Sequence, residues 1–295
     1  EIFIADSGNN RIRVLNRYGQ IQQAVGTGSA GSGAEEDEYP SNSTMNSPRG
    51  MVLTHTTSSF GGHLVWADTS NHRIRIWNRT SSDQTLFGVT VTAGKVATIG
   101  GNGSSGNLTA GSALQAAFSS PSGVAFDGTD LYVSDTSNHC IKKIDSTGQL
   151  SGVAGTCGTS GNVNGSFGVS RMTSPEGIEY YDYNGHKGLV IAASGNNRIK
   201  FYRIAGSSLL FGGSVSVGDT NSIICGGTFH TDGISSPTIA ICSGTYGVTV
   251  SGGNVCFTNY SYHNVRCVTP GGTVTTAMGA VEGIDDTTNL YFPGT

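Results

Sequence analysis

One short pattern repeats along the whole chain and constrains its fold more than any other feature. In its clearest copy, Leu64-Val65-Trp66-Ala67-Asp68 is followed by Thr69-Ser70-Asn71-His72 and then by Arg73-Ile74-Arg75-Ile76. The apolar run suits a buried strand, and the alternation with period 2 indicates a second strand. The short polar side chains between them can bond to nearby backbone and accept the left-handed conformation. The pattern therefore predicts a hairpin with a tight turn.

The hairpin recurs at a period of roughly 60 to 65 residues, which is longer than the common propeller repeats, so each unit must carry insertions. Further copies begin at Ile2, Leu131 and Leu189, a drifted copy begins at Val255, and Leu290 opens a truncated sixth. The predicted repeat-turn residues are Asp6, Asn10, Asp68, His72, Asp135, His139 and Asn197. A repeat of this kind predicts one supersecondary unit per copy, packed against its neighbours.

A second element precedes each hairpin. It reads Ser47-Pro48-Arg49-Gly50, Ser120-Pro121-Ser122-Gly123 and Ser174-Pro175-Glu176-Gly177, and it weakens to Tyr246-Gly247 and Glu282-Gly283. Together with the Asp-x-x-Asn-x-Arg-Ile cores, this element resembles the NHL repeat family of β-propellers. The resemblance covers essentially the whole chain. It implies an all-β fold of four-stranded antiparallel blades in a single domain over residues 1–295, and it implies no particular function, because one fold hosts many functions.

The number of blades depends on the two ends of the chain. Glu1 already begins a second strand, whereas Val281–Asp285 matches an inner strand. Six blades are expected, with a neighbouring domain or a second copy of the protein in contact at the seam. The alternative is five blades, with the two termini sharing one blade so that no sheet edge is exposed. A chain that starts and stops inside repeat units is interpreted as a mature or trimmed piece of a longer protein.

Six cysteines indicate the compartment. The sequence has no Cys-x-x-Cys, which argues against a structural zinc site or a redox motif. Two of the predicted pairs are symmetric about a predicted turn, so that they face across neighbouring strands, and the third closes the loop between two blades. The predicted pairs are Cys140–Cys157, Cys225–Cys242 and Cys256–Cys267. Three bridges predict an extracellular protein, secreted or at the cell surface; the alternative is six buried free thiols in a cytosolic protein.

Six Asn-x-Ser/Thr sequons mark candidate N-glycosylation sites. They are Asn42, Asn78, Asn102, Asn107, Asn164 and Asn259. Their number is about what chance gives in a chain so rich in Ser and Thr. Four of them, Asn42, Asn102, Asn107 and Asn164, lie in predicted loops, where a glycan has room.

Composition disfavours several classes of function. The net charge is −4, and Lys and Arg are spread as one small set per repeat, so nucleic acid is not an expected partner. No apolar run approaches the roughly 20 residues that span a bilayer. The acidic run 35–38 stacks its carboxylates consecutively, whereas calcium loops alternate their ligands, so it is interpreted as a solvated loop. No metal and no cofactor are expected.

A metal-dependent enzyme is the alternative function. Propellers related by resemblance include lactonases and lyases that hold a metal on the central axis with carboxylates, amides and histidines. Here His72, His139 and His263 share a repeat position with asparagines, which indicates a turn residue rather than a ligand. Glu176 and Glu282 stand at the start of inner strands and are the first candidates for such a centre.

The sequence favours a module without catalytic residues. Its loops at the two ends of the blades are expected to recognise a protein or a glycan, or to serve a structural role.

Overall fold

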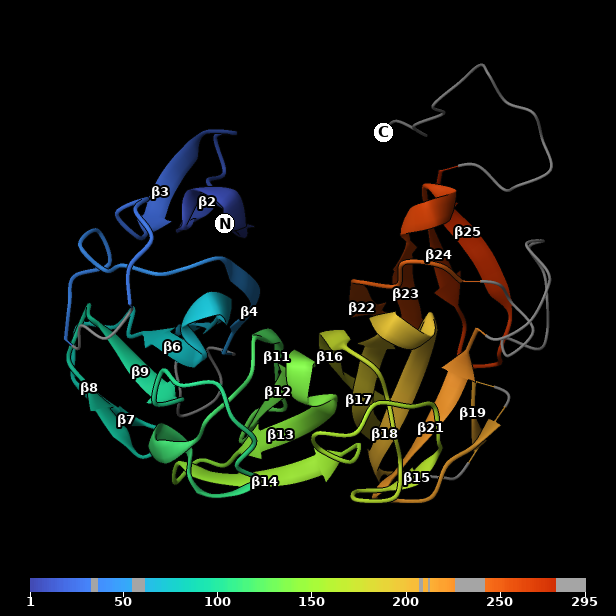
Figure 1. The fold of residues 1–295 in the computed structure, drawn as a ribbon. Coiled ribbons are helices and arrows are strands. Elements are labelled where there is room, and N and C mark those ends of the chain that lie inside the picture. Colours follow the sequence, from blue (N-terminus) through green and yellow to red (C-terminus); the bar gives the residue numbers. More distant parts are fainter. Residues whose placement is uncertain (33–36, 55–61, 207–208, 212, 226–241, 280–295) are drawn as a thin grey trace. The chain divides into compact units, whose positions relative to one another are not determined.

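The computed structural model describes residues 1–32, 37–54, 62–206, 209–211, 213–225 and 242–279. Over these residues the strands form five antiparallel blade sheets and two small hairpins, joined by turns and short 3₁₀ helices (Figure 1). The predicted β-propeller fold is confirmed. The chain divides into two compact units, Glu1–Val153 with Cys157–Ser160 and Ala154–Thr156 with Gly161–Thr295.

The first unit contains blades 1 to 3. Each blade runs from an inner strand to an outer strand, and blade 1 has no inner strand among the described residues. Blade 1 consists of β1 (Ile2–Asp6), β2 (Arg11–Leu15) and β3 (Ile21–Val25). Blade 2 consists of β4 (Pro48–Leu53), β5 (Leu64–Asp68), β6 (Arg73–Trp77) and β9 (Val96–Gly100). A separate hairpin, β7 (Gln84–Leu86) with β8 (Val89–Val91), interrupts it.

Blade 3 carries a fifth strand outside its outer strand. Its strands are β11 (Pro121–Phe126), β12 (Leu131–Asp135), β13 (Cys140–Ile144) and β14 (Gln149–Ala154), with β10 (Ala110–Ser112) paired to β14. A 3₁₀ helix, η3 (Ala113–Gln115), follows β10.

The second unit contains blades 4 and 5. Blade 4 consists of β16 (Pro175–Tyr183), β17 (His186–Ala193), β18 (Arg198–Ala205) and β21 (Asp219–Ile224), with β15 (Gly165–Ser166) at its outer edge. It is interrupted by the hairpin β19 (Leu209–Leu210) with β20 (Gly213–Ser214). Blade 5 consists of β22 (Val248–Ser251), β23 (Asn254–Asn259), β24 (Asn264–Val268) and β25 (Val274–Met278).

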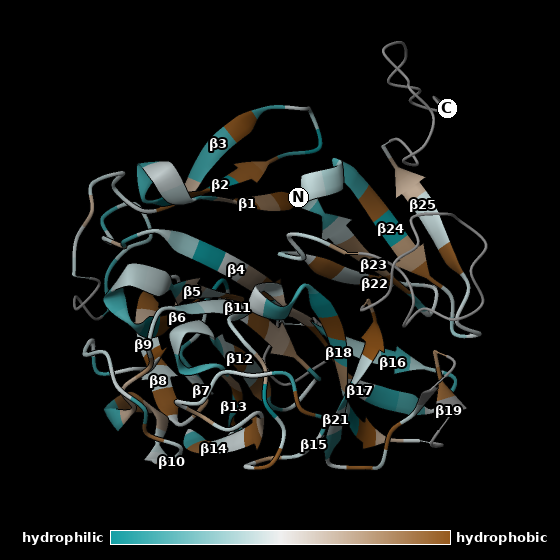
Figure 2. Ribbon diagram, turned by 45° about the vertical axis from the view of Figure 1, so that its right-hand side comes forward, coloured by the Kyte–Doolittle hydropathy of each residue, from teal (hydrophilic) through white to brown (hydrophobic). Residues whose placement is uncertain are grey.

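Successive side chains of a strand point to opposite faces of a blade, and apolar side chains occur on both faces. In β5, Leu64 and Trp66 pack with Ile12 of blade 1, whereas Val65 and Ala67 pack in a core that blade 3 completes. Blades 4 and 5 share a comparable core in the second unit. Figure 2 shows the hydrophobic residues concentrated on the strands. Burial between successive blades therefore supplies the main stabilising free energy in each unit.

The glycine of the Pro-x-Gly element is explained by close approach of neighbouring inner strands. A Cβ atom at Gly50 would lie 2.5 Å from the carbonyl oxygen of Ser122, and one at Gly177 would lie 2.6 Å from that of Tyr246. The Gly177 N–H also donates to the Tyr246 carbonyl at 2.9 Å. Only glycine lets the backbones of successive blades meet at this distance.

The described residues make up five blades, which is the number in the alternative prediction. The segments on which a sixth blade depends, Val281–Asp285 and Leu290–Phe292, lie outside the described residues. Among the residues that are described, no helix is long and apolar enough to cross a membrane.

Candidate functional site

The repeated turns are 3₁₀ turns that end on a left-handed residue. The turns are η1 (Ser7–Asn9), η2 (Thr69–Asn71), η4 (Thr136–Asn138), η5 (Ser194–Asn196) and η7 (Tyr260–Tyr262). The next residue has a φ of 50° to 60° in every case: Asn10, His72, His139, Asn197 and His263. This position takes Asn or His although most non-glycine residues avoid the conformation.

Three of these left-handed residues tie one blade to the next. Asn10 accepts a hydrogen bond through Oδ1 from the Ser47 N–H at 3.0 Å, and His72 accepts one through Nδ1 from the Ser120 N–H at 3.0 Å. Both donors precede the proline that starts the following inner strand. The same bond in the second unit joins Asn197 Oδ1 to the Gly244 N–H at 2.9 Å. We call such a side chain the latch residue of its blade. A side chain with an acceptor atom is what the position requires, which is why Asn and His interchange there.

The repeated aspartate bonds to the short segment that comes just before the inner strand of its own blade. We call this the lead-in segment; in blade 2 it contains Asn46 and Ser47, which precede β4. Asp68 is fully buried, and its carboxylate accepts from the Asn46 N–H at 2.7 Å and from Asn71 Nδ2 at 2.8 Å. The guanidinium of Arg75 lies 4.0 Å away. Burial raises the pKa of Asp68 to about 6, against these hydrogen bonds, which favour the charged form.

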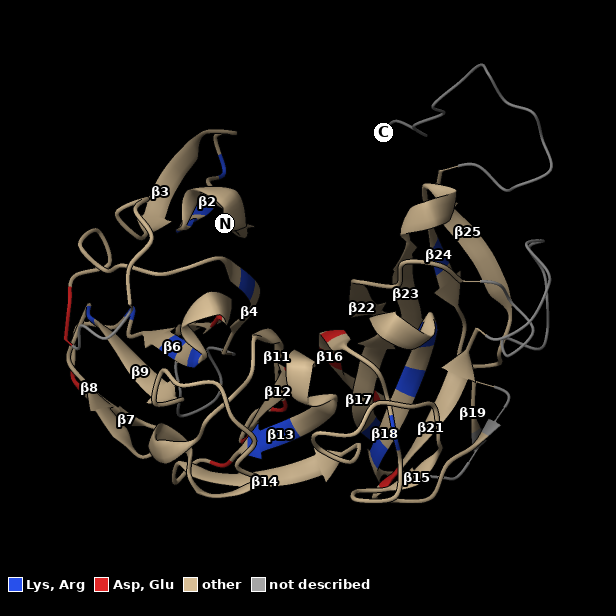
Figure 3. Ribbon diagram, in the orientation of Figure 1, with Lys and Arg blue, Asp and Glu red and all other residues tan. Residues whose placement is uncertain are grey.

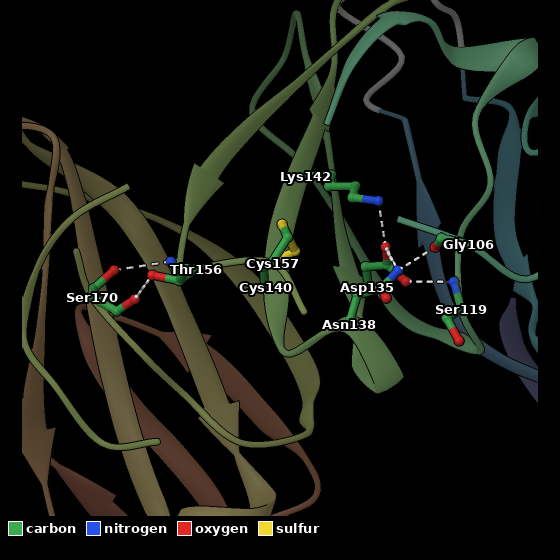
Figure 4. Close-up of a disulfide and its surroundings, with 10 residues drawn as sticks. Gly106, Ser119, Asp135, Asn138, Cys140, Lys142, Thr156, Cys157 and Ser170 are labelled. Carbon is green, nitrogen blue, oxygen red and sulfur yellow. Dashed lines mark hydrogen bonds and ion pairs between the residues drawn. A yellow bond between two sulfur atoms is a disulfide. The ribbon is translucent and has the colours of Figure 1, made fainter. Parts of the chain in front are cut away.

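Asp135 repeats this arrangement in blade 3 (Figure 4). Its carboxylate accepts from the Ser119 N–H at 2.7 Å and from Asn138 Nδ2 at 2.7 Å, and Lys142 Nζ lies 2.6 Å from it. Both partners of this ion pair are fully buried. Burial raises the pKa of Asp135, while the Lys142 ammonium acts in the opposite direction.

Blades 4 and 5 replace the aspartate in different ways. Ala193 stands at the position in blade 4, and Asn196, one turn further on, accepts the lead-in N–H of Thr173 at 2.6 Å instead. In blade 5, Asn259 Oδ1 accepts the N–H of Ser243 at 2.8 Å. The hydrogen bond to the lead-in segment is therefore retained in both blades although the residue that makes it changes.

Four of the third strands each place one basic residue in the blade interior. Arg75, Lys142, Lys200 and Arg266 are fully buried or nearly so, and Figure 3 marks basic residues in blue along the ribbons of β6, β13 and β18. They are not available as a basic surface, which nucleic-acid binding requires.

Among the described residues, no group of three or more His, Cys, Asp and Glu side chains could hold a metal ion. His72 already bonds the next blade through Nδ1. Glu176 lies partly buried at the start of β16, and Glu282, the other candidate for an axial metal, lies outside the described residues. The Glu35 and Glu36 carboxylates of the acidic run lie outside them as well.

The six cysteines form the three predicted disulfides. The Cα–Cα distances are 5.0 Å for Cys140–Cys157, 5.5 Å for Cys225–Cys242 and 4.0 Å for Cys256–Cys267. Cys256 and Cys267 are directly opposite each other on β23 and β24. Figure 4 shows the first bridge at the beginning of β13. These bridges are typical of an oxidising compartment.

The structure separates the six sequons into two groups. Asn78 and Asn259 are fully buried, and Asn78 donates to the carbonyls of Ser82 and Val91, so the folded protein has no room for a glycan at either site. The exposed group consists of Asn42, Asn102, Asn107 and Asn164, the four that the sequence places in loops.

Two surface depressions could take a ligand. A groove of about 320 Å³ in the first unit is lined by Asp37, Val89, Thr90, Thr92, Ala97, Thr98 and Leu114. A more apolar pocket of about 430 Å³ in blade 5 is lined by Tyr246, Thr258, Tyr260, His263, Asn264, Val265 and Met278. Sequence reasoning missed both, because each combines residues from several strands.

Sequence reasoning also missed the role of a repeated Leu-Phe-Gly. Phe87 lies at the tip of the β7–β8 hairpin with a φ of 49° and is buried against Phe126 of blade 3, with ring centroids 6.2 Å apart. Phe211 lies at the tip of β19–β20 with a φ of 52°, and its N–H donates to the carbonyl of Pro270 in blade 5 at 3.0 Å. The tip of each hairpin therefore contacts the next blade, through the core of blade 3 in the first case and through a turn of blade 5 in the second. The recurrence of Leu-Phe-Gly in both excursions was the available signal.

The NHL repeat model matches residues 118–144, which cover the lead-in segment of blade 3 and its strands β11, β12 and β13. NHL repeat-containing protein 2 is 41% identical over 91 residues in Gallus gallus and 34% identical over 127 residues in Homo sapiens. These alignments cover 30% and 42% of this chain but only 10% and 15% of the relatives. The chain therefore matches a small part of each relative's length.

Solved structures share the fold at low sequence identity. An auxiliary nutrient binding protein from Bacteroides ovatus is 11% identical with a TM-score of 0.52, over 92% of this chain and 55% of that one. A streptogramin B lyase is 15% identical with a TM-score of 0.50, over 93% of this chain and 66% of that one. A binding protein and an enzyme both occur on this architecture, so the likeness carries no function. With the family match and the repeated geometry together, the chain is a β-propeller that contains an NHL repeat.

Proposed function

We propose that this chain is an extracellular binding or structural module that recognises a protein or glycan partner through the loops of its blades. One observation carries the proposal: the polar residues that recur in the repeat are used for hydrogen bonds within a blade and from one blade to the next. The carboxylates of Asp68 and Asp135 bond to lead-in segments, and the latch residues Asn10, His72 and Asn197 bond to the next blade. Recognition is then left to surface residues that differ between blades.

The disulfides support the extracellular part of the proposal. All six cysteines are paired within the chain, and none is free. Reducing compartments do not maintain such bridges in most organisms.

The groove beside β8 favours a glycan among the two partner classes. Thr90 and Thr92 lie on or beside this strand, and Asp37 also lines the groove. Hydroxyl groups and a carboxylate can bond to sugar hydroxyls, while Val89 and Leu114 supply apolar contact. The volume of about 320 Å³ is at the lower end of the range that small-ligand sites occupy.

The test is a titration of the disulfide-bonded chain with a panel of neutral oligosaccharides, followed by calorimetry. Thr90→Val and Thr92→Val together should weaken binding about tenfold, because each removes one hydrogen bond to the ligand. Thr249→Val changes an exposed threonine of β22 and serves as the matched control. Equal affinity in both variants would remove the groove from the proposal.

A chelator separates the binding module from the metal-dependent enzyme. The melting temperature should be unchanged by EDTA, since a metal bound only to the native state would stabilise it. A large decrease would favour the enzyme.

A further inference from the structure

Lys200 in blade 4 is a buried cation that lacks the acidic partner found at its position in blade 3. There, Lys142 Nζ lies 2.6 Å from the Asp135 carboxylate. Ala193 stands at the aspartate position in blade 4, and among the described residues no carboxylate pairs with Lys200. Lys200 is nevertheless fully buried, and desolvation by burial lowers its pKa to about 8, with Arg198 acting in the same direction. A carboxylate beside it would therefore stabilise blade 4.

Lys200 contacts the side-chain amide of Asn164 instead. Its Nζ atom donates to Asn164 Oδ1 at 3.3 Å and to Ser222 Oγ at 3.1 Å. Ser222 donates to the same Oδ1 through its N–H at 3.0 Å and through its hydroxyl at 3.4 Å. Within the part of the chain that the structure describes, all hydrogen bonds of the Asn164 side chain are made by Oδ1. Three donors, one of them charged, thus meet at one amide oxygen, as they do in sites that stabilise a developing oxyanion.

The residue after Asn164 is a glycine. Gly165 and Ser166 form β15, which lies at the outer edge of blade 4, and Asn164 is exposed to water. The main-chain nitrogen of a following residue can attack the side-chain Cγ atom of an asparagine, and a glycine there has no side chain to obstruct the approach. The fold itself favours this glycine, because its φ is 136° and an added Cβ atom would lie 3.2 Å from Val169 Cγ1. An unobstructed nucleophile and a polarised amide therefore meet at Asn164.

We propose that Asn164 is a site of self-catalysed deamidation, at which Lys200 and Ser222 promote the conversion of the amide to a carboxylate that then pairs with Lys200. In the first step the main-chain nitrogen of Gly165 loses its proton to water and bonds to Asn164 Cγ. The Cγ–Nδ2 bond breaks, and Nδ2 takes up a proton and leaves as ammonia. The charge that develops on Oδ1 in this step is stabilised by the three donors. The product is a five-membered cyclic imide that joins Asn164 to Gly165.

Water opens the imide in the second step. Addition of water at Cγ, followed by cleavage of the bond from Cγ to the Gly165 nitrogen, restores the main chain and leaves an aspartate at position 164. Addition at the main-chain carbonyl gives isoaspartate instead. The donors at Oδ1 polarise the Cγ carbonyl, so aspartate should be the main product. Aspartate cannot accept a glycan, so the reaction also removes this sequon. The proposal is independent of the groove in the first unit.

Two other Asn-Gly sequences of the chain serve as internal controls. Asn102 Oδ1 accepts one neutral donor, the Ser104 N–H at 2.8 Å. Asn184 is exposed in the turn between β16 and β17, and among the described residues no hydrogen bond reaches its side chain. A cationic donor therefore distinguishes Asn164 from both.

The test follows all three asparagines in one sample. The disulfide-bonded chain is produced in a host that attaches no N-glycans, incubated at neutral pH in H₂¹⁸O and mapped by mass spectrometry. Asn164 should react about tenfold faster than Asn184, because a charged hydrogen bond stabilises its transition state. It should also incorporate ¹⁸O and give a higher ratio of aspartate to isoaspartate than Asn184.

Variants at Lys200 test its role in the reaction. Lys200→Met should slow the reaction at Asn164 about tenfold, because it removes the charged hydrogen bond to Oδ1, and should leave the rate at Asn184 unchanged. Lys200→Arg should keep the reaction, because arginine occupies this strand position in blades 2 and 5, as Arg75 and Arg266.

Asn164→Asp supplies the product directly and tests its ion pair. The new carboxylate should favour the charged form of Lys200 and raise its pKa. Urea denaturation should therefore show a smaller rise of stability above about pH 8 in this variant than in the unmodified chain. Asn184→Asp, at the exposed turn, is the matched control and should show the same rise as the unmodified chain.

Two results would overturn the proposal. The first is an equal rate at Asn164 and Asn184, or a rate at Asn164 that Lys200→Met leaves unchanged. The second is a loss of ammonia without uptake of water, with Lys200 and Asn164 recovered in one linked peptide. That outcome would make Lys200 itself the nucleophile in place of the Gly165 nitrogen.

Discussion

Lys200 shows how a single residue departs from the repeat. It occupies in blade 4 the position of Arg75 and Lys142, opposite Ile191 of the second strand, but Ala193 stands where those blades have an aspartate. Its Nζ atom is fully buried, 3.3 Å from Asn164 Oδ1 and 3.1 Å from Ser222 Oγ. Desolvation by burial lowers the pKa of Lys200 to about 8, and the nearby Arg198 acts in the same direction.

This depressed pKa predicts a pH dependence of stability. Between about 8 and the ordinary value of 10.5, the unfolded chain binds a proton at Lys200 that the folded chain does not. Stability should therefore rise with pH across this window, by up to roughly 3 kcal/mol for this group. Lys200→Met should remove the rise and increase the free energy of unfolding at pH 7, as measured by urea denaturation at several pH values.

The matched control is Lys143→Met in blade 3. Lys143 is partly exposed and paired with Asp130 at 2.7 Å, which raises its pKa, so this variant should lose a little stability instead of gaining it. A pH profile that is the same in Lys200→Met and in the unmodified chain would contradict the assignment. Ala193→Asp should restore an ion-pair partner and move the rise to higher pH.

Asp68 gives a second prediction at the residue scale. Asp68→Ala removes the acceptor for the Asn46 N–H and the Asn71 amide and leaves a buried site without its carboxylate, at a cost of about 3 kcal/mol. Asp68→Asn keeps one acceptor oxygen and should cost less. Asp6→Ala, at the partly exposed equivalent in blade 1, should have the smallest effect. Equal losses in all three variants would mean that the lead-in hydrogen bond does not stabilise the fold.

At the residue scale, the sequence predicts where the turns lie. It does not predict which residue replaces the repeated aspartate where that residue is missing. Short polar residues between two strands indicate a turn wherever they occur, and the φ of His72 follows from that pattern. That Asn196 takes over from the missing aspartate of blade 4 could not be predicted, because the bond depends on a 2.6 Å approach of a lead-in segment 23 residues away.

At the element scale, the Leu-Phe-Gly hairpins decide how blades pair. A Cβ atom at Gly88 would lie 2.3 Å from the carbonyl oxygen of Thr147 in blade 3, and Gly88 has a φ of +74°. Gly94 has nearly the same φ, +72°, and open space around it. The two glycines therefore separate backbone strain from contact with the next blade.

We expect Gly94→Ala to destabilise the fold by about 1 kcal/mol through strain alone. Gly88→Ala should cost more, because the hairpin must also move away from the turn of blade 3. Chemical denaturation of both variants measures the difference. If the two variants lose the same free energy of unfolding, contact of the hairpin tip with blade 3 does not add to the cost of the substitution.

The sequence predicted the strands of the blades, but it did not predict the contacts of the Leu-Phe-Gly hairpins with the next blade. The strands follow from period-2 alternation and from the repeated hairpin, which are local signals. Pairing of β8 with β7 places Phe87 in a left-handed conformation that bulky residues rarely adopt. Burial against Phe126 compensates for that strain, and this contact between blades has no local sequence signal.

At the scale of the whole molecule, the disulfides make the stability of the fold depend on whether the compartment is oxidising or reducing. Cys140–Cys157 closes a loop with a sequence separation of 17, and Cys256–Cys267 closes one of 11. In the chain-entropy account each bridge contributes about 3 kcal/mol by restricting the unfolded chain. Loss of both is a large fraction of the stability of a typical folded protein.

Reduction should therefore lower the melting temperature of the protein substantially, and Cys140→Ser with Cys157→Ser should reproduce part of the loss without reductant. Non-reducing peptide mapping of the purified protein should recover the three pairs that the structure contains. In the double variant, reductant should still act through the two remaining bridges, so its effect should be smaller than in the unmodified chain. Free thiols at all six positions, with a melting temperature insensitive to reductant, would remove the support for an extracellular module, because a chain whose blades need no bridges is equally stable in a reducing compartment.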